Sequence, residues 1–259
     1  MLDEKIVNNL NSEKDQIAKE LKNISRLNAI SVPELMEENH EGKPGHNSIY
    51  MRALASSSAD LLHKDAIVNK VVVHMESYEK FVEYVSETLL QDIRKMIFIG
   101  GNTRHHRYLR HIVSEANVIA RHLMEAKGMH NLIMGNICLP EKGSESKRVL
   151  FRTVSGAQFF TTQILFDSRQ IIDILGGYNR LCLSVDVKPS FVLLSFAPLK
   201  GSSDLNLLDF VGANMPIKAR DYILESGELS ETPKRSVINP SELTGMLPKD
   251  RRERCRGSH

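Results

Sequence analysis

The chain lacks most of what would connect it to a disulfide framework, a membrane or a nucleic acid. It has 259 residues, no tryptophan and only three cysteines, Cys138, Cys182 and Cys255. Few and irregularly spaced cysteines are typical of a reducing compartment. No apolar run approaches the roughly 20 residues of a membrane span, and a net charge of +2 is too small to favour nucleic acid or an anionic membrane. Together with a polar start that lacks a secretory signal, these absences predict a cytoplasmic protein without membrane or nucleic-acid partners.

Several catalytic signatures are absent as well. The sequence contains no Gly-x-Gly-x-x-Gly turn after a predicted strand, no phosphate-binding P-loop and no Gly-x-Ser-x-Gly nucleophile elbow. His106 and His111 are not at the i, i+4 spacing of a helical zinc pair, so we expect no metal site. The cationic run 103–111 predicts either a positive rim over a pocket or a solvated helix start.

What the sequence does contain is a repeated alternation of short apolar strands and amphipathic helices. Such an alternation predicts a parallel sheet covered by helices, and we expect a (β/α)8 TIM-type barrel, complete or trimmed. A doubly wound open sheet is the alternative fold. Strands are predicted at 29–32, 70–74, 95–99, 131–134, around Phe160 and at 191–196, with 181–185 as a further candidate. Helices are predicted at 48–63, 77–92, 108–127, 144–155, 168–176, 203–212 and 216–226.

The two ends of the chain differ from this repeat. Residues 1–25 have the pattern of an extra amphipathic helix, which would close one end of the barrel or contact another subunit. Residues 229–259 are polar and rich in proline, and their last four residues look like the remnant of an expression tag. We therefore expect a single α/β barrel domain over 1–228, followed by a polar tail.

Polar groups follow the predicted strands at their carboxyl ends. In a barrel these ends converge on one site. Small and amide groups there predict a pocket for a planar heterocycle rather than for a phosphate or a metal ion. The groups are Glu34, His74, Gly100-Gly101-Asn102, Gly135-Asn136, Gln163 and Ser195.

The segment 156–167 is the most informative part of the pattern. A buried strand ends at Thr162-Gln163, and Asp167 is expected to cap a new helix that begins at Ser168. A buried amide is costly unless it finds partners, and at this end of a strand the partner is often a ligand. Gln163 therefore binds either a ligand or a neighbouring loop. Glu34, after Pro33, is either a general acid with a raised pKa or one half of an ion pair.

This segment resembles the methylenetetrahydrofolate reductase family of flavin-containing (β/α)8 barrels. The resemblance lies on Arg152, Ser155-Gly156-Ala157, Thr162-Gln163 and Phe166-Asp167, and a weaker similarity extends over 28–200. It implies that Gln163 and Asn102 bind the pterin of a folate and that Glu34 is the catalytic acid.

On the cofactor side the resemblance is weaker. It implies that His74, Gly100, Gly101, Glu145 and Arg152 lie beside a flavin. The family's Arg-Gly-Asp is replaced here by Gly100-Gly101-Asn102, which removes two charges from that side. A divergent member is therefore expected, either with FAD or with direct hydride transfer from NAD(P)H.

The leading hypothesis is reduction of 5,10-methylenetetrahydrofolate to 5-methyltetrahydrofolate, a step of one-carbon metabolism that supplies methionine biosynthesis. The first alternative is a pterin-binding barrel that works with a methyltransferase or corrinoid partner and has no reductase activity. The second is a non-catalytic subunit, or a homo-oligomer, that uses the helix at 1–25 for contact. Glu34 separates the first two hypotheses, because reduction needs an acid and simple binding does not.

Overall fold

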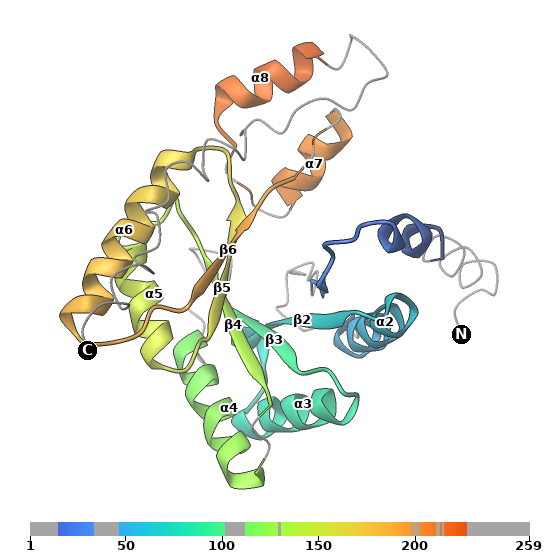
Figure 1. Cartoon of the computed structure of the whole chain (residues 1–259), viewed down its shortest axis with the longest axis vertical. Coiled ribbons are helices and arrows are strands. Elements are labelled where there is room, and N and C mark those ends of the chain that lie inside the picture. The colour runs from blue at the N-terminus through green and yellow to red at the C-terminus, as the bar shows by residue number, and fades with distance from the viewer. Residues whose placement is uncertain are drawn as a thin grey trace, which may run out of the picture. The chain divides into compact units, whose positions relative to one another are not determined.

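The computed structural model describes residues 15–33, 47–101, 112–128, 131–197, 199, 202–210, 213 and 215–226. Strands and helices alternate along these residues (Figure 1). The strands are β1 (Ala29–Val32), β2 (Asp65–Val71), β3 (Lys95–Ile99), β4 (Ile133–Cys138), β5 (Phe159–Ile164) and β6 (Phe191–Ser195). The helices are α2 (Asn47–Leu62), α3 (Tyr78–Leu90), α4 (Val113–Lys127), α5 (Glu145–Val154), α6 (Ser168–Ser184), α7 (Ser202–Phe210) and α8 (Ile217–Ser226), and η1 (Val72–His74) is a short 3-10 helix.

The strands lie in the sheet in the order in which they occur along the chain, β1-β2-β3-β4-β5-β6. β1 pairs with β2, β2 with β3 and β3 with β4, all in parallel, and an α-helix separates each strand from the next. Sequential order is that of a (β/α)8 barrel, whereas a doubly wound sheet reverses its order at a switch point. The α/β prediction is confirmed, and the described residues supply six of a complete barrel's eight strands.

The predicted strand at 70–74 is wrong in its position. β2 begins at Asp65, and Val72 already lies in the 3-10 helix η1 that follows the strand. The polar residues Asn69 and Lys70 interrupt the apolar pattern of the true strand. The β-branched Val72 is fully buried because it packs in the core after the strand has ended. His74 therefore lies in η1, three residues beyond β2, and not at a strand end.

The prediction that Gly176-Gly177 ends a helix is also wrong, as is the strand at 181–185. α6 continues through both glycines to Ser184, because Ile171, Tyr178 and Cys182 form one buried face. A Cβ at Gly177 would lie 2.8 Å from Ser146 Oγ, and this hydroxyl donates to Ile174 O at 3.0 Å. Gly177 thus permits the close approach of α5 and α6, and it does not stop the helix.

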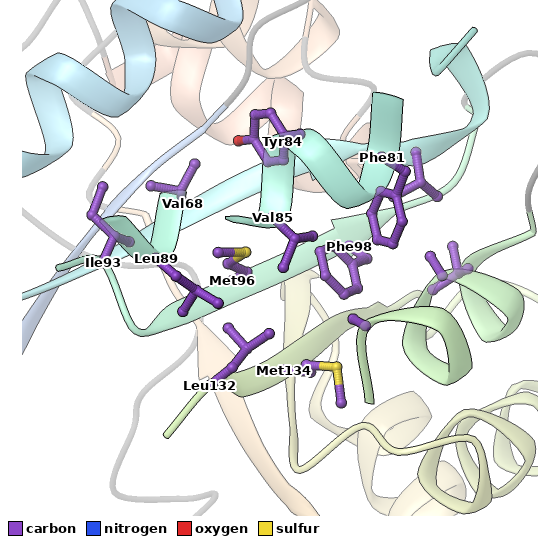
Figure 2. Close-up of a cluster of buried hydrophobic side chains, with 14 of the residues drawn as sticks. Val68, Phe81, Tyr84, Val85, Leu89, Ile93, Met96, Phe98, Leu132 and Met134 are labelled. Carbon is purple, nitrogen blue, oxygen red and sulfur yellow. The ribbon is translucent and has the colours of Figure 1, made fainter. Parts of the chain in front are cut away.

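The chain divides into two compact units. The first comprises Met1–Ile137 with Phe151–Phe160, and the second comprises Cys138–Leu150 with Thr161–His259. The core of the first unit lies between β2, β3, β4 and the helices α3 and α4. Its aromatic centre is the edge-to-face pair of Phe81 and Phe98, with ring centroids 5.2 Å apart. Figure 2 shows these two rings next to each other in the cluster that also contains Met96 and Met134.

The second unit has a smaller core of its own. Leu205 and Leu208 of α7 are buried with Ile223 of α8, and Ile164 and Phe166 pack against them. The end of β5 is therefore held in place by the carboxyl-terminal helices of the same unit.

Other predictions about the ends of the chain fall partly outside the described residues. Residues 15–22 are helical, and Ile17, on the apolar face of the predicted amphipathic helix, is 56% exposed, while Ala18 is buried. Residues 1–14 and the tail 229–259 lie outside the described ranges, and the single-domain prediction stays a prediction. Within those ranges, every helix is too short or too polar to cross a bilayer.

Candidate functional site

A small pocket lies at the carboxyl end of β5, within the second unit. It has a volume of about 150 Å³, and Gln163 lines it. The segment after β4, the start of α6 and Pro216 provide the rest of the wall. The structure therefore places Gln163 in the wall of a concave site, and whether it binds a ligand there stays a prediction.

The alternation of β5 explains why Gln163 is available to this pocket. Thr161 and Gln163 share one face of the strand, and Thr162 and Ile164 share the other. The second face is occupied, since Thr162 Oγ1 accepts a hydrogen bond from Ser195 N at 2.9 Å and Ile164 packs in the α7–α8 core. Gln163 is half-buried, and its Oε1 accepts from Ile164 N at 3.2 Å.

The beginning of α6 forms another part of the wall. Asp167 caps the helix as predicted, because one carboxylate oxygen accepts from Arg169 N at 2.8 Å. Gln170, in the first turn, also lines the pocket. Phe166 and Pro216 provide apolar surface beside these polar groups. No lysine, arginine or histidine of the described residues lines the pocket, so its side chains offer mainly hydrogen-bond acceptors.

Glu141 is a residue of this pocket that the sequence reasoning missed. The predicted strand at 131–134 ends too early, because β4 extends to Cys138, and Pro140-Glu141 follows its true end after one residue, Leu139. The signal was present in the sequence, since an apolar strand followed by Pro-Glu is the same pattern that singled out Pro33-Glu34.

Gly135 and Asn136, which were expected beyond the end of β4, lie inside the strand. Asn136 is fully buried, and its amide exchanges hydrogen bonds with Asn117 of α4 at 2.8 and 3.2 Å. It also donates to Phe98 O at 3.1 Å. This side chain faces the helices and not a pocket, because its register partner is Phe98 of the main core.

The absence of a side chain at Gly135 serves packing. A Cβ there would lie 2.4 Å from Cζ of Phe159, which belongs to the cluster of Ile67 and Ile97 on the other face of the sheet. The ring of Phe159 therefore occupies the space that a side chain at position 135 would take.

The residues expected beside a flavin fall into two groups. Some make hydrogen bonds within the protein, and the others have no side chain that the structure describes. Glu145 is buried, and its carboxylate accepts from Leu139 N at 3.0 Å and from Arg148 Nε at 2.6 Å. Arg152 Nη1 donates to Ile137 O at 2.6 Å. Both side chains thus form hydrogen bonds with backbone atoms of the protein itself.

The structure describes less of the two glycines and the histidine expected beside a flavin. A Cβ at Gly100 would be at an ordinary distance, 3.4 Å, from Val113, so no close backbone approach requires this glycine. Gly101 is the last described residue before a gap, and of His74 only the backbone in η1 is described. The only buried side-chain nitrogen or oxygen without a partner, within the described ranges, is Arg52 Nε on α2. Of the residues expected beside a flavin, the two polar side chains that the structure describes, Glu145 and Arg152, do not present donors that fit a flavin.

Two predicted site residues, Glu34 and Asn102, lie outside the described residues, as does the cationic run 103–111. The two described thiols do not offer a nucleophile. Cys138 and Cys182 are both fully buried, and burial raises the pKa of the Cys182 thiol, partly offset by a hydrogen bond with Tyr178.

Comparison with known proteins gives information on the fold. No family model and no curated protein matches the chain. The solved structure of a protein from Clostridium thermocellum that binds two copies of 5-methyl-5,6,7,8-tetrahydrofolic acid is similar, with a TM-score of 0.66 and 14% sequence identity. The similarity covers 92% of this chain and 75% of that chain.

A second similar structure is that of oxaloacetate acetylhydrolase in complex with the inhibitor 3,3-difluorooxalacetate. It has a TM-score of 0.49 and 11% identity, over 88% of this chain and 83% of that chain. That score is too low to support an argument. The chain therefore shares its fold with a protein that binds a reduced folate, and at 14% identity the fold alone is what they are shown to share.

Proposed function

We propose that this chain binds a reduced folate and that the pterin ring lies in the pocket at Gln163. The observation that carries the proposal is the placement of Gln163 at the end of β5 in a pocket with polar and apolar walls. Support comes from the resemblance of the segment 152–167 to a folate-binding motif. Further support comes from the methyltetrahydrofolate bound by the protein of similar fold.

The chemistry of the pocket agrees with a pterin head group. A carboxamide can donate and accept hydrogen bonds at the same time, and a pterin presents both kinds of group along one edge. Phe166 and Pro216 offer apolar surface to the ring. At about 150 Å³ the pocket is smaller than the roughly 300–1,000 Å³ of sites that enclose a drug-sized ligand. It would hold the ring and leave the rest of the folate outside.

The proposed reaction is reduction of 5,10-methylenetetrahydrofolate to 5-methyltetrahydrofolate. Glu34 would protonate N10 as the bond between N10 and the methylene carbon breaks, and the resulting iminium carbon would accept a hydride from NADH or NADPH. A flavin step is not part of this proposal, because Glu145 and Arg152 bind the chain's own backbone. The alternative is folate binding without reduction, in the service of a methyltransferase partner.

The binding proposal is tested by titrating 5-methyltetrahydrofolate into the wild-type protein and into Gln163→Ala, with calorimetry as the measurement. Loss of a half-buried polar partner should weaken binding by about 1–3 kcal/mol, or roughly 5- to 150-fold in Kd. Gln91→Ala removes an exposed amide of the first unit and serves as the matched control, with Kd unchanged. An unchanged Kd in Gln163→Ala would remove this pocket from folate binding.

The reduction is tested separately. The visible spectrum of the purified protein is recorded, and NADH or NADPH oxidation is then followed anaerobically with methylenetetrahydrofolate. Turnover by protein without flavin absorption would support direct hydride transfer. Absence of turnover, with or without added FAD, in a protein that binds the folate would refute the reduction and favour the binding-only alternative.

A further inference from the structure

Among the described residues, the pocket at Gln163 combines several hydrogen-bond acceptors and has no cationic side chain in its wall. Its polar side chains are the carboxylates of Glu141 and Asp167 and the amides of Gln163 and Gln170. A site with this lining repels phosphates and carboxylates, because none of the described side chains in its wall carries a positive charge that would compensate the two carboxylates. It favours a ring whose edge carries several N–H donors.

The two carboxylates differ in what they are free to do. Asp167 is engaged as the cap of α6 through its bond from Arg169 N. Glu141 is exposed, and no hydrogen bond or ion pair of its carboxylate occurs within the described part of the chain. Of the two, Glu141 is therefore the carboxylate that the described residues leave unengaged.

The backbone around Glu141 is held in place from both sides. Lys142 N donates to Leu139 O at 3.0 Å, which closes a four-residue turn with Pro140 and Glu141 at its centre. Proline is favoured at the first central position of such a turn. The buried carboxylate of Glu145 then accepts from Leu139 N at 3.0 Å and anchors the turn to α5. Glu141 is thus presented on a fixed turn, and Glu145 is the positioning residue beneath it.

We infer that Glu141 is the second anchor of the ring and that its carboxylate recognises the N–H edge of a 2-amino-4-oxopyrimidine. The 2-amino group and the neighbouring ring N–H are parallel donors, and two carboxylate oxygens accept such a pair in the way they accept a guanidinium. Gln163 binds a different edge of the same ring. This inference rests on the proposed folate binding and extends it, since it makes the 2-amino group the feature that the site selects.

The test compares two ligands and three proteins. Kd is measured for 5-methyltetrahydrofolate and for its 2-desamino analogue with wild type, with Glu141→Gln, and with Glu125→Gln. The last variant removes an exposed carboxylate of α4 and is the matched control. For the natural ligand, Glu141→Gln should weaken binding about 10-fold or more, the scale of a hydrogen bond to a charged group. For the analogue, all three proteins should bind with similar affinity.

The outcomes distinguish a failure of the role of Glu141 from a failure of folate binding itself. Equal affinity of wild type and Glu141→Gln for 5-methyltetrahydrofolate, while Gln163→Ala still loses affinity, would overturn the role of Glu141 and leave folate binding intact. An equal loss for both ligands in Glu141→Gln would also overturn it, since the 2-amino group would then not be the group recognised. No binding by the wild-type protein would refute the proposed function and this inference together.

Discussion

The two neighbouring strands β4 and β5 carry an amide side chain each, and the two amides have opposite roles. Asn136 of β4 is fully buried and is satisfied by Asn117 and by Phe98 O. Gln163 of β5 is half-buried and lines a pocket. Asn136 belongs to the core of the first unit, and Gln163 belongs to the pocket of the second unit.

The comparison shows that two side chains with the same amide group can have different roles. The face of the strand that carries each side chain decides which role it has. A shift of one residue along a strand moves a side chain to the opposite face of the sheet. Asn136 is in register with Phe98 and so faces α4, whereas Gln163 shares its face with Thr161, away from the α7–α8 core. Substitutions at the two positions should therefore affect different measurements.

The largest expected effect on stability is that of Asn136→Ala. Removing the amide breaks both hydrogen bonds with Asn117 and the bond to Phe98 O inside the core, so the free energy of unfolding should fall by about 2–4 kcal/mol. Urea denaturation followed by circular dichroism measures it. Gln163→Ala should change stability by less than about 0.5 kcal/mol in the same assay. Comparable losses of unfolding free energy in both variants would contradict the different roles assigned to Asn136 and Gln163.

An intermediate effect is expected from Gly135→Ala. The new methyl group would collide with Phe159, and the ring would have to move, at a cost of about 1–3 kcal/mol. Gly143→Ala is the matched control, because a Cβ at Gly143 meets nothing within 4 Å. Thermal unfolding should separate the two variants clearly. If both melt at the wild-type temperature, Phe159 has room that the structure does not show.

A smaller loss of stability is expected from Asp167→Ala, on the pocket side of the comparison. Loss of the cap leaves Arg169 N without its acceptor and should cost about 1 kcal/mol of stability. Asp167→Asn retains an acceptor oxygen and should stay near the wild-type value. The free energies of unfolding of the two variants, measured side by side, test this. A loss in the asparagine variant equal to that in the alanine variant would mean that charge, and not the cap, is what matters.

The helices and most strands could be predicted from the sequence because their apolar patterns are regular. The strand at 95–99 agrees with β3 to the residue, and the helix at 77–92 agrees with α3 to within two residues. The failures occurred where tertiary packing overrides local signals. Asn69 and Lys70 concealed β2, and Gly177 was interpreted as a helix stop although its role is close contact with Ser146.

The site could be predicted only in part. Gln163 was identified because a polar group at the end of an apolar strand is conspicuous, and Asp167 because it precedes a helix. Glu141 was missed because the end of β4 was placed four residues too early, at Met134. Asn136 was expected at the strand end for the same reason, and the sequence contains no indication that Asn117, nineteen residues away, is its partner.

The mutual satisfaction of Asn117 and Asn136 has a consequence for how this chain can change over time. Either residue alone is hard to replace, since the remaining amide would lose both hydrogen bonds of the pair and keep only its bonds to backbone carbonyls. Replacement of both by apolar residues of similar shape would be much less costly. The two positions are therefore expected to change together or not at all, so that related sequences should carry either the amide pair or an apolar pair, and rarely a mixture.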